Sequence, residues 1–440
     1  MIERLTIHRF RGIRQGELSD LGKINLLIGP NNSGKTAILE MLYLGGTSGR
    51  PAQFIRQDLS PEEGVFDATT SLPSDLLGFP PLSRLRERHG KNPLWLKNPA
   101  VLTEAGSLQV NLAALHNNHA PWKSFQLSTP LEEWGDQSTQ FTQSDIEQLA
   151  LFTLTKANKI HASMIPSYFE EAQVRSEETR WHYLWEPEWA HLGQRKWPID
   201  HMAVWAEAGR PSQAEQVLFF DFHTANAHFT RSFAQWAKNQ TWDWIKRIGE
   251  HLIPVFPDLK GTKIEIDDAP DTPTGKSGYI QRKGERRLSI DQFGDGARHA
   301  FKMLAGLVAL AESVDEEHPG LFLWEDPELF MHPEALYRLL DEVMHIVENQ
   351  PIQLFITSQS LEFVGLLTSL FQQKQEKQQK TLRTFRLKLD AGQLYAAKFR
   401  FENLYTWLEQ GMDPRFWSAA ELPISYRYRE IEKIFSEEDI

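Results

Sequence analysis

The chain has 440 residues, 41% of them hydrophobic, which suits either one large domain with an insertion or two to three domains. It contains no cysteine, so disulfides and thiolate metal sites are excluded, and we expect a cytoplasmic protein. The formal net charge of −12 excludes a chain that is basic overall, although it does not report local patches that bind nucleic acid. No apolar run approaches about 18 residues, so we expect no membrane partner.

Two short strands are predicted at the beginning of the chain. Residues 2–7 alternate apolar and polar side chains, and residues 24–28 form an apolar run typical of a buried strand. Between them lie Arg9, Phe10 and Arg11. These three side chains either contact a nucleotide or mark a strand end with solvated arginines, and the sequence alone does not decide between the two.

Residues 29–36, Gly-Pro-Asn-Asn-Ser-Gly-Lys-Thr, match the pattern G-x-x-x-x-G-K-[ST] at every fixed position. They follow the strand 24–28 and precede residues 37–44, which predict a helix. In such a unit the backbone N–H groups of the turn and the positive end of the helix face a phosphate. We therefore expect Lys35 to reach the β- and γ-phosphates and Thr36 to hold Mg2+.

The middle of the chain is harder to interpret. Residues 45–140 are rich in proline and glycine and suggest a strand-rich lobe, whereas residues 141–215 look helical and are rich in tryptophan. Trp181, Trp185 and Trp189 recur at the spacing of one helical face, although Pro187 interrupts it. Such a stripe is either a surface for a partner or for nucleic-acid bases, or, more commonly, the packed face of an insertion.

The last part of the chain, residues 216–440, predicts a second lobe. Residues 217–221 and 263–266 are expected strands, and residues 229–253 are an expected amphipathic helix. Gly294 and Gly296 then precede a strongly helical run at 300–312, an arrangement that suits an anion but often is only a helix cap.

An apolar strand at residues 321–324 ends in two acids, Glu325 and Asp326. Nucleotide hydrolysis needs one carboxylate near Mg2+ and another that orients the attacking water, and adjacent acids at a strand end can serve both needs. The alternative is an acidic loop after a core strand.

Residues 352–360 give another apolar strand that ends in small polar residues. Residues 371–380 are polar and predict a solvated loop, and 381–389 with 393–401 predict a hairpin followed by helices.

In order, the chain has a phosphate loop, a Gly-x-Gly segment, Glu-Asp-Pro-Glu with a later His-Pro, and a strand that ends Thr-Ser-Gln-Ser. This series resembles the ABC-type ATPases of the SMC/RecF class. More narrowly, it resembles prokaryotic AAA-family ATPases related to the OLD family, many of which belong to phage-defence systems. The resemblance covers roughly residues 1–50 and 215–415.

The resemblance implies an α/β fold, namely an ABC-type P-loop ATPase head of two lobes with a mixed sheet, flanking helices and a mainly helical Trp-rich insertion. The implied domains are residues 1–140 and 216–440 for the two lobes and 141–215 for the insertion. In this class two heads enclose two ATP molecules, and the signature of one head contacts the nucleotide of the other. The resemblance also assigns roles to individual residues: phosphate binding to Asn31, Asn32, Ser33, Gly34, Lys35 and Thr36; the signature in trans to Gly294, Asp295 and Gly296; Mg2+ to Thr36 and Glu325; and catalysis to Glu325, Asp326 and Gln359. ABC-type ATPases also have a glutamine that senses the γ-phosphate; Gln53 and Gln57 are the candidates, and the alternative for each is an ordinary loop residue.

Two departures from the family pattern concern the chemistry. The family usually reads Asp-Glu-Pro-Glu, so in this chain the metal-side carboxylate, Glu325, is the longer side chain and the base, Asp326, is the shorter one. The family usually has His at the switch position, while this chain has Gln359, which can donate a hydrogen bond but cannot carry a proton. Together these departures predict slow hydrolysis and a nucleotide-dependent switch rather than a motor.

Nuclease signatures are missing from the sequence. OLD-type relatives often carry a Toprim nuclease after the head, but the last 80 residues after Ser360 contain no Asp-x-Asp cluster. We expect the chain to be the ATPase alone, to form a homodimer or higher oligomer through shared ATP, and to control a separate effector such as a nuclease or toxin. Two alternatives stay open: a RecF-like ATPase that binds DNA, and a scaffold that binds ATP without hydrolysing it.

Overall fold

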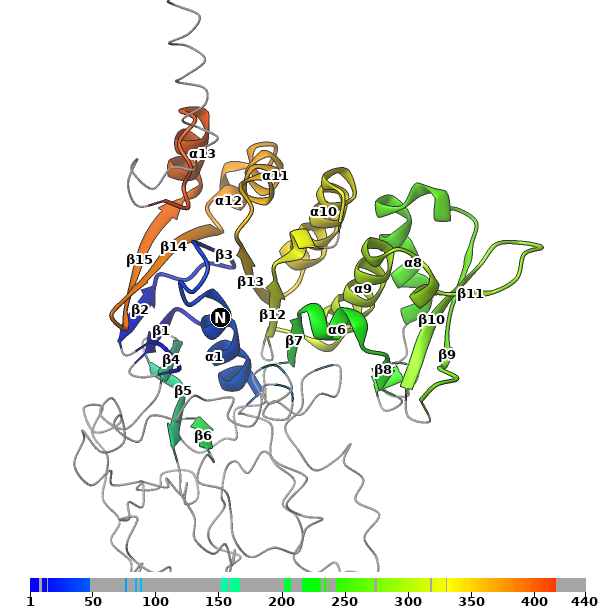
Figure 1. The fold of residues 1–440 in the computed structure, drawn as a ribbon, viewed down its shortest axis with the longest axis horizontal. Coiled ribbons are helices and arrows are strands. Elements are labelled where there is room, and N and C mark those ends of the chain that lie inside the picture. The colour runs from blue at the N-terminus through cyan, green and yellow to red at the C-terminus, as the bar shows by residue number, and fades with distance from the viewer. Residues whose placement is uncertain are drawn as a thin grey trace, which may run out of the picture.

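A six-stranded sheet forms the centre of the computed structural model, and the strand before the phosphate loop lies inside it (Figure 1). Its order is β15-β14-β3-β13-β12-β7, and all neighbours are parallel except β14 and β15. The strands are β3 (Ile24–Ile28), β7 (Gln216–Phe220), β12 (Gly320–Glu325), β13 (Ile352–Ser358), β14 (Leu382–Asp390) and β15 (Gln393–Arg400). The structure describes residues 1–7, 10–13, 15–47, 76, 84, 88, 152–156, 159–166, 202–206, 216–230, 233–234, 237, 243–272, 275–316, 319–329 and 331–416.

Both faces of this sheet are covered, which explains why its strands are apolar at successive positions. Leu26 and Leu27 are both fully buried, but they belong to different cores on opposite faces. Helix α1 (Lys35–Thr47) packs on one face, and the opposite face carries most of the other helices (Figure 1). These are α8 (Trp244–Val255), α9 (Asp295–Ser313), α10 (Pro333–Asn349), α11 (Leu361–Gln372) and α13 (Phe401–Glu409), with the short α6 (Phe222–Asn226) and α12 (Glu376–Gln379) beside them.

A second, antiparallel sheet lies on the side of α1 and has the order β2-β1-β4-β5-β6. Three of its strands come from the segment that was predicted to be a mainly helical insertion, so that prediction is wrong for the described part of residues 141–215. Because β1 pairs with β4, the sheet also crosses the expected domain boundary at residue 140. The tryptophan stripe at 181–189 lies outside the described residues. The strands are β1 (Arg4–Ile7), β2 (Gly16–Ser19), β4 (Phe152–Lys156), β5 (Lys159–Pro166) and β6 (Met202–Ala206).

A third, small sheet lies beside α8 and α9, and in it β10 pairs antiparallel with each of β8, β9 and β11. The helix expected at 229–253 is corrected here, since residues 229–230 form a strand and the helix begins only at Trp244, capped by Asp243. Likewise, part of the loop expected at 371–380 is the one-turn helix α12. The strands are β8 (Phe229–Thr230), β9 (Lys263–Asp268), β10 (Gly275–Gln281) and β11 (Leu288–Ser289).

The fold is therefore of the α/β class, with a mixed sheet and flanking helices, which confirms the main prediction from the sequence. The predicted hairpin near the end of the chain is confirmed as β14 and β15, with Ala391 and Gly392 at positive φ in its turn. Within the described ranges, none of the helices is both long and apolar enough to cross a membrane.

Gly278 is required by the contact between β10 and α9. A Cβ atom at this position would lie 2.2 Å from Cε1 of Phe301, a fully buried ring. We expect Gly278→Ala to lower the free energy of unfolding by about 1–3 kcal/mol, because the core would be overpacked. The measurement is a urea unfolding curve. Gly365→Ala is the matched control: nothing lies within 4 Å of its added Cβ in α11, so it should raise stability by about 0.5–1 kcal/mol.

Candidate nucleotide-binding site

The phosphate loop has the backbone that its glycines allow. Gly29 and Gly34 have φ values of 150° and 94°, and Asn32 lies in the left-handed region at 62°. A Cβ atom at Gly29 would meet Leu387 O at 2.5 Å, so only glycine lets the loop pass this close to β14. The loop is thus held as a tight turn at the N-terminus of α1, which is the arrangement expected for phosphate binding.

Lys35 is buried inside this loop rather than extended into solvent. Its Nζ donates to Gly29 O at 2.9 Å and to Pro30 O at 3.0 Å. Burial lowers the pKa of Lys35, and the nearby carboxylates of Asp326, Glu328 and Glu325 oppose this effect. The only cation of the loop therefore lies near the acidic end of β12, which β13 separates from β3 in the sheet.

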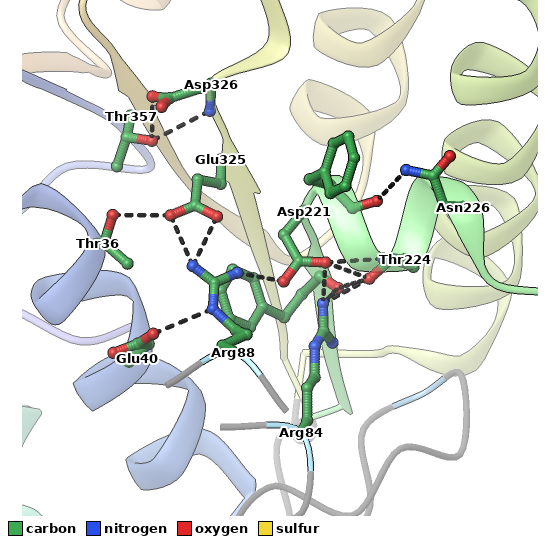
Figure 2. Close-up of polar contacts among 12 residues, drawn as sticks. Thr36, Glu40, Arg84, Arg88, Asp221, Thr224, Asn226, Glu325, Asp326 and Thr357 are labelled. Carbon is green, nitrogen blue, oxygen red and sulfur yellow. Dashed lines mark hydrogen bonds and ion pairs between the residues drawn. The ribbon is translucent and has the colours of Figure 1, made fainter. Parts of the chain in front are cut away.

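Thr36 and Glu325 join the phosphate loop to the acidic strand end. Thr36 Oγ1 donates to Glu325 Oε1 at 2.8 Å, although the two residues are far apart in the sequence (Figure 2). Burial raises the pKa of Glu325, and Arg88 is the main group that opposes this effect. The pair predicted to hold Mg2+ thus lies together at the carboxyl end of β12.

Asp326 is fixed by the adjacent strand, β13. It follows β12 in a left-handed conformation with φ of 42°, and its N–H donates to Thr357 O at 3.2 Å. Thr357 Oγ1 in turn donates to Asp326 Oδ1 at 2.9 Å (Figure 2). The two acids of the sequence motif therefore have different environments: Glu325 binds Thr36, and Asp326 binds Thr357.

A third carboxylate, that of Glu328, lies beside the switch residue. Ser358 Oγ donates to Glu328 Oε1 at 2.8 Å, and the N–H of Gln359 donates to the same oxygen at 3.0 Å. Gln359 is exposed, and its carbonyl accepts from Arg415 Nη1 at 2.6 Å. The structure thus brings Gln359 next to the acidic segment through its backbone, and the role predicted for its side chain stays a prediction.

The predicted signature lies on another element of the chain. Gly294 caps α9, and Asp295 begins the helix and pairs with Arg298 at 2.6 Å. Gly294 and Asp295 are exposed. In the described part of the chain, no hydrogen bond or ion pair connects residues 294–296 with residues 31–36. The signature is therefore not assembled with the phosphate loop of the same chain.

The structure adds a charged cluster that the sequence reasoning missed (Figure 2). Arg88 contacts Glu40, Asp221 and Glu325, while Arg84 pairs with Asp221 at 2.8 Å. Two signals were present in the sequence. Asp221 ends an apolar strand in the same way as Glu325, and Glu40 lies one helical turn after Thr36. Nothing in the sequence marks the two arginines beyond their spacing of four residues.

Arg11 is also part of this cluster, because it forms an ion pair with Glu40 and its side chain is 10% exposed. The alternative of a solvated arginine is therefore wrong for Arg11, whereas contact with a nucleotide stays a prediction. Arg9, Gln53 and Gln57 lie outside the described residues.

The residues present fit a nucleotide with a magnesium ion. Ser33 Oγ of the loop is buried and has no hydrogen-bond partner among the described residues, which is suited to a phosphate oxygen. No cluster of three or more possible metal ligands occurs in the described ranges. Mg2+ bound to a nucleotide needs only one or two carboxylates, since phosphate and water supply the other ligands. Thr36 and Glu325 would hold the ion, and Ser33 and Lys35 would contact the phosphates.

The fold and this site define a P-loop nucleotide-binding protein. The model of the family described as "AAA domain, putative AbiEii toxin, Type IV TA system" matches residues 144–365, slightly more than half of the chain. The chain therefore belongs to this AAA family. The matched region contains Glu325, Asp326 and Gln359 and follows the phosphate loop in the sequence.

Short segments are also similar to curated proteins. The DNA replication and repair protein RecF of Psychromonas ingrahamii is 51% identical over 45 residues, which are 10% of this chain and 12% of that protein. RecF of Proteus mirabilis is 49% identical over 46 residues, 10% of this chain and 13% of that protein. The chain thus matches only about an eighth of the length of these relatives. With the family match, they support the ATPase class SMC/RecF that the motifs predicted.

Among solved structures, the SMC head bound to the C-winged helix domain of ScpA has 10% identity and a TM-score of 0.43, and covers 92% of this chain and 99% of that one. The SMC head domain from Thermotoga maritima has 8% identity and a TM-score of 0.35, with 90% and 98% covered. At these scores the similarity does not identify a function.

Proposed function

We propose that the chain binds and slowly hydrolyses Mg2+·ATP between its phosphate loop and the acidic end of β12, and that it acts as a nucleotide-dependent switch. The observation that carries this proposal is the contact between Thr36 and Glu325, because it joins two motifs at the position where a nucleotide-bound metal ion is needed. Membership of an AAA family supports ATPase activity in general.

Each group of the chain has a separate role in this proposal. The backbone of the loop and Lys35 bind phosphate, and Thr36 with Glu325 would hold the divalent ion, which neutralises the charge of the phosphates. Asp326 orients the attacking water, in a position that Thr357 fixes. Because this base is the shorter acid and Gln359 cannot carry a proton, we propose that turnover is slow.

We further propose that the signature at Gly294, Asp295 and Gly296 acts on the nucleotide of a second copy. The exposure of Gly294 and Asp295, and the lack of a hydrogen bond or ion pair from residues 294–296 to residues 31–36 in the described part of the chain, support an assembly in which ATP joins two heads. On this basis the protein is a cytoplasmic dimer or higher oligomer. The likeness to OLD-type defence ATPases suggests that it holds or releases a separate nuclease or toxin as effector.

A second candidate function is a DNA-maintenance ATPase, favoured by the segments similar to RecF. ATP hydrolysis that rises when DNA is added, without a copurifying effector, would favour this candidate. ATP binding and oligomerisation without any phosphate release would instead favour a structural scaffold.

Light scattering with and without Mg2+·ATP tests the switch, with phosphate release read in parallel. We expect ATP to raise the mass of the wild type, and Asp326→Asn to hold the larger species, because the variant binds ATP but lacks the carboxylate that orients water. Phosphate release from the variant should fall at least about 100-fold. A mass that never changes with ATP would contradict the switch, and fast turnover by the wild type would contradict slow hydrolysis.

A further inference from the structure

Arg88 contacts three carboxylates that belong to three different elements (Figure 2). Its Nε lies 3.2 Å from Oε1 of Glu40 on α1, and its Nη1 pairs with Asp221 after β7. Its Nη2 lies 2.8 Å from Oε2 and 2.9 Å from Oε1 of Glu325. The side chain is 9% exposed, so solvent screens these contacts little.

Two of the three carboxylates that contact Arg88 also form an ion pair with another arginine. Asp221 also pairs with Arg84, and Glu40 also pairs with Arg11. For Glu325, Arg88 is the one ion-pair partner found among the described residues. Among the described residues the cluster holds three arginines and three carboxylates, and of these carboxylates Glu325 is the one whose ion pair is made by Arg88 alone.

The Arg88 contact covers the same oxygens that a metal ion would use. Glu325 Oε1 accepts from Thr36 Oγ1 at 2.8 Å and from Arg88 at 2.9 Å, and Oε2 also faces Arg88. A divalent cation bound to Glu325 beside Thr36 would place two further positive charges next to a buried guanidinium. Such like charges repel strongly where water is scarce.

We propose that Arg88 is a resident cation of the metal position, which competes with the divalent ion for Glu325 and so sets the metal concentration at which the site is loaded. This inference rests on the proposed function, since it takes Thr36 and Glu325 as the metal ligands. Because Asp221 and Glu40 hold the rigid guanidinium at Nη1 and Nε, Arg88 keeps two partners when the carboxylate of Glu325 turns away from Nη2 toward the ion.

The test is a titration of the full chain with Mn2+, in which EPR reports the free ion, with and without the ATP analogue AMP-PNP. We expect Arg88→Gln to bind Mn2+ about tenfold more tightly than the wild type, or better, because one buried positive charge is gone. Arg88→Lys keeps the charge and should stay within about threefold of the wild type. If Arg88→Gln binds Mn2+ equally or more weakly, Arg88 does not compete, and the proposal is wrong.

A second comparison, made in the variant Asp221→Asn, controls for a folding defect caused by Arg88→Gln. Asp221→Asn keeps a side chain that caps α6 and removes one carboxylate from the cluster, so Arg88→Gln in this background leaves the described cluster with Arg11, Arg84, Glu40 and Glu325, two groups of each sign. We expect the double variant to bind Mn2+ more tightly than Asp221→Asn alone, and the opposite order would overturn the proposal. If the wild type binds no Mn2+ with AMP-PNP, the proposed function fails together with this inference. If the wild type binds it and Arg88→Gln gains nothing, only the inference fails.

Discussion

Lys35→Ala is expected to weaken ATP binding at least about 100-fold, corresponding to about 3 kcal/mol. The lysine is the cation of the phosphate loop, and its Nζ already lies against Gly29 O and Pro30 O, so it is ordered before a ligand arrives. Charge-assisted hydrogen bonds to phosphate are the strongest contacts such a loop makes. Titration with a fluorescent ATP analogue measures the change.

Lys23→Ala is the matched control for this variant. Lys23 precedes β3 at the end opposite to the phosphate loop, and its Nζ donates to Glu348 O at 3.0 Å. Its removal should leave ATP affinity within about twofold, because the charge is far from the phosphates and screened. Equal affinity of Lys35→Ala and the wild type would remove the phosphate-loop basis of the proposed function.

Asp221→Ala is expected to lower the free energy of unfolding by about 3–5 kcal/mol, the loss that follows when one partner of a buried ion pair is removed. Asp221 is fully buried and accepts from Arg84, from Arg88 and from both the N–H and Oγ1 of Thr224. The variant would leave two guanidinium groups with one acceptor fewer and would uncap α6. A urea unfolding curve measures the loss.

Asp20→Ala provides the comparison on the surface. Asp20 pairs with Lys398 and Arg383, but its side chain is 46% exposed. Its loss should cost less than about 1 kcal/mol, as for most exposed ion pairs. If the two aspartate variants were equally stable, the buried cluster would not be a stabilising feature.

The Asp221 cluster also gives stability a defined dependence on pH. Burial alone would raise the pKa of Asp221, but Arg84, Arg88 and the bonds from Thr224 outweigh it and hold the pKa well below its usual range. A depressed pKa in the folded state contributes stability above the unfolded value of about 3.9. This contribution is lost as pH falls below that value. In Asp221→Asn, this part of the acid-induced loss of stability should be absent.

The sequence determined the local units of this protein, because each depends on residues that are close in the chain. Residues 24–28 are apolar at every position but Asn25, and residues 29–36 carry the glycines and the lysine of the loop, so strand, turn and helix start were all predictable. The strand before Glu325 and the hairpin around Gly392 were predictable for the same reason.

Predictions failed where pairing with a distant strand decided the local structure. Residues 152–156 and 229–230 are strands because they pair with β1 and β10, and short segments with mixed patterns do not reveal such partners. For this reason the predictions of a helix at 229–253 and of a mainly helical insertion were wrong.

In the candidate site, too, the sequence indicated individual residues, and the tertiary structure decided how they contact one another. The motifs alone indicated Lys35, Thr36 and Glu325, because phosphate and metal chemistry require these residue types at short spacing or at a strand end. That Thr36 bonds Glu325, and that Arg88 joins Glu325 to Asp221 and Glu40, was decided only by the tertiary structure. Parallel strands bring their carboxyl ends to one edge of the sheet, and the buried carboxylates gathered there need cations that arrive from elsewhere in the chain.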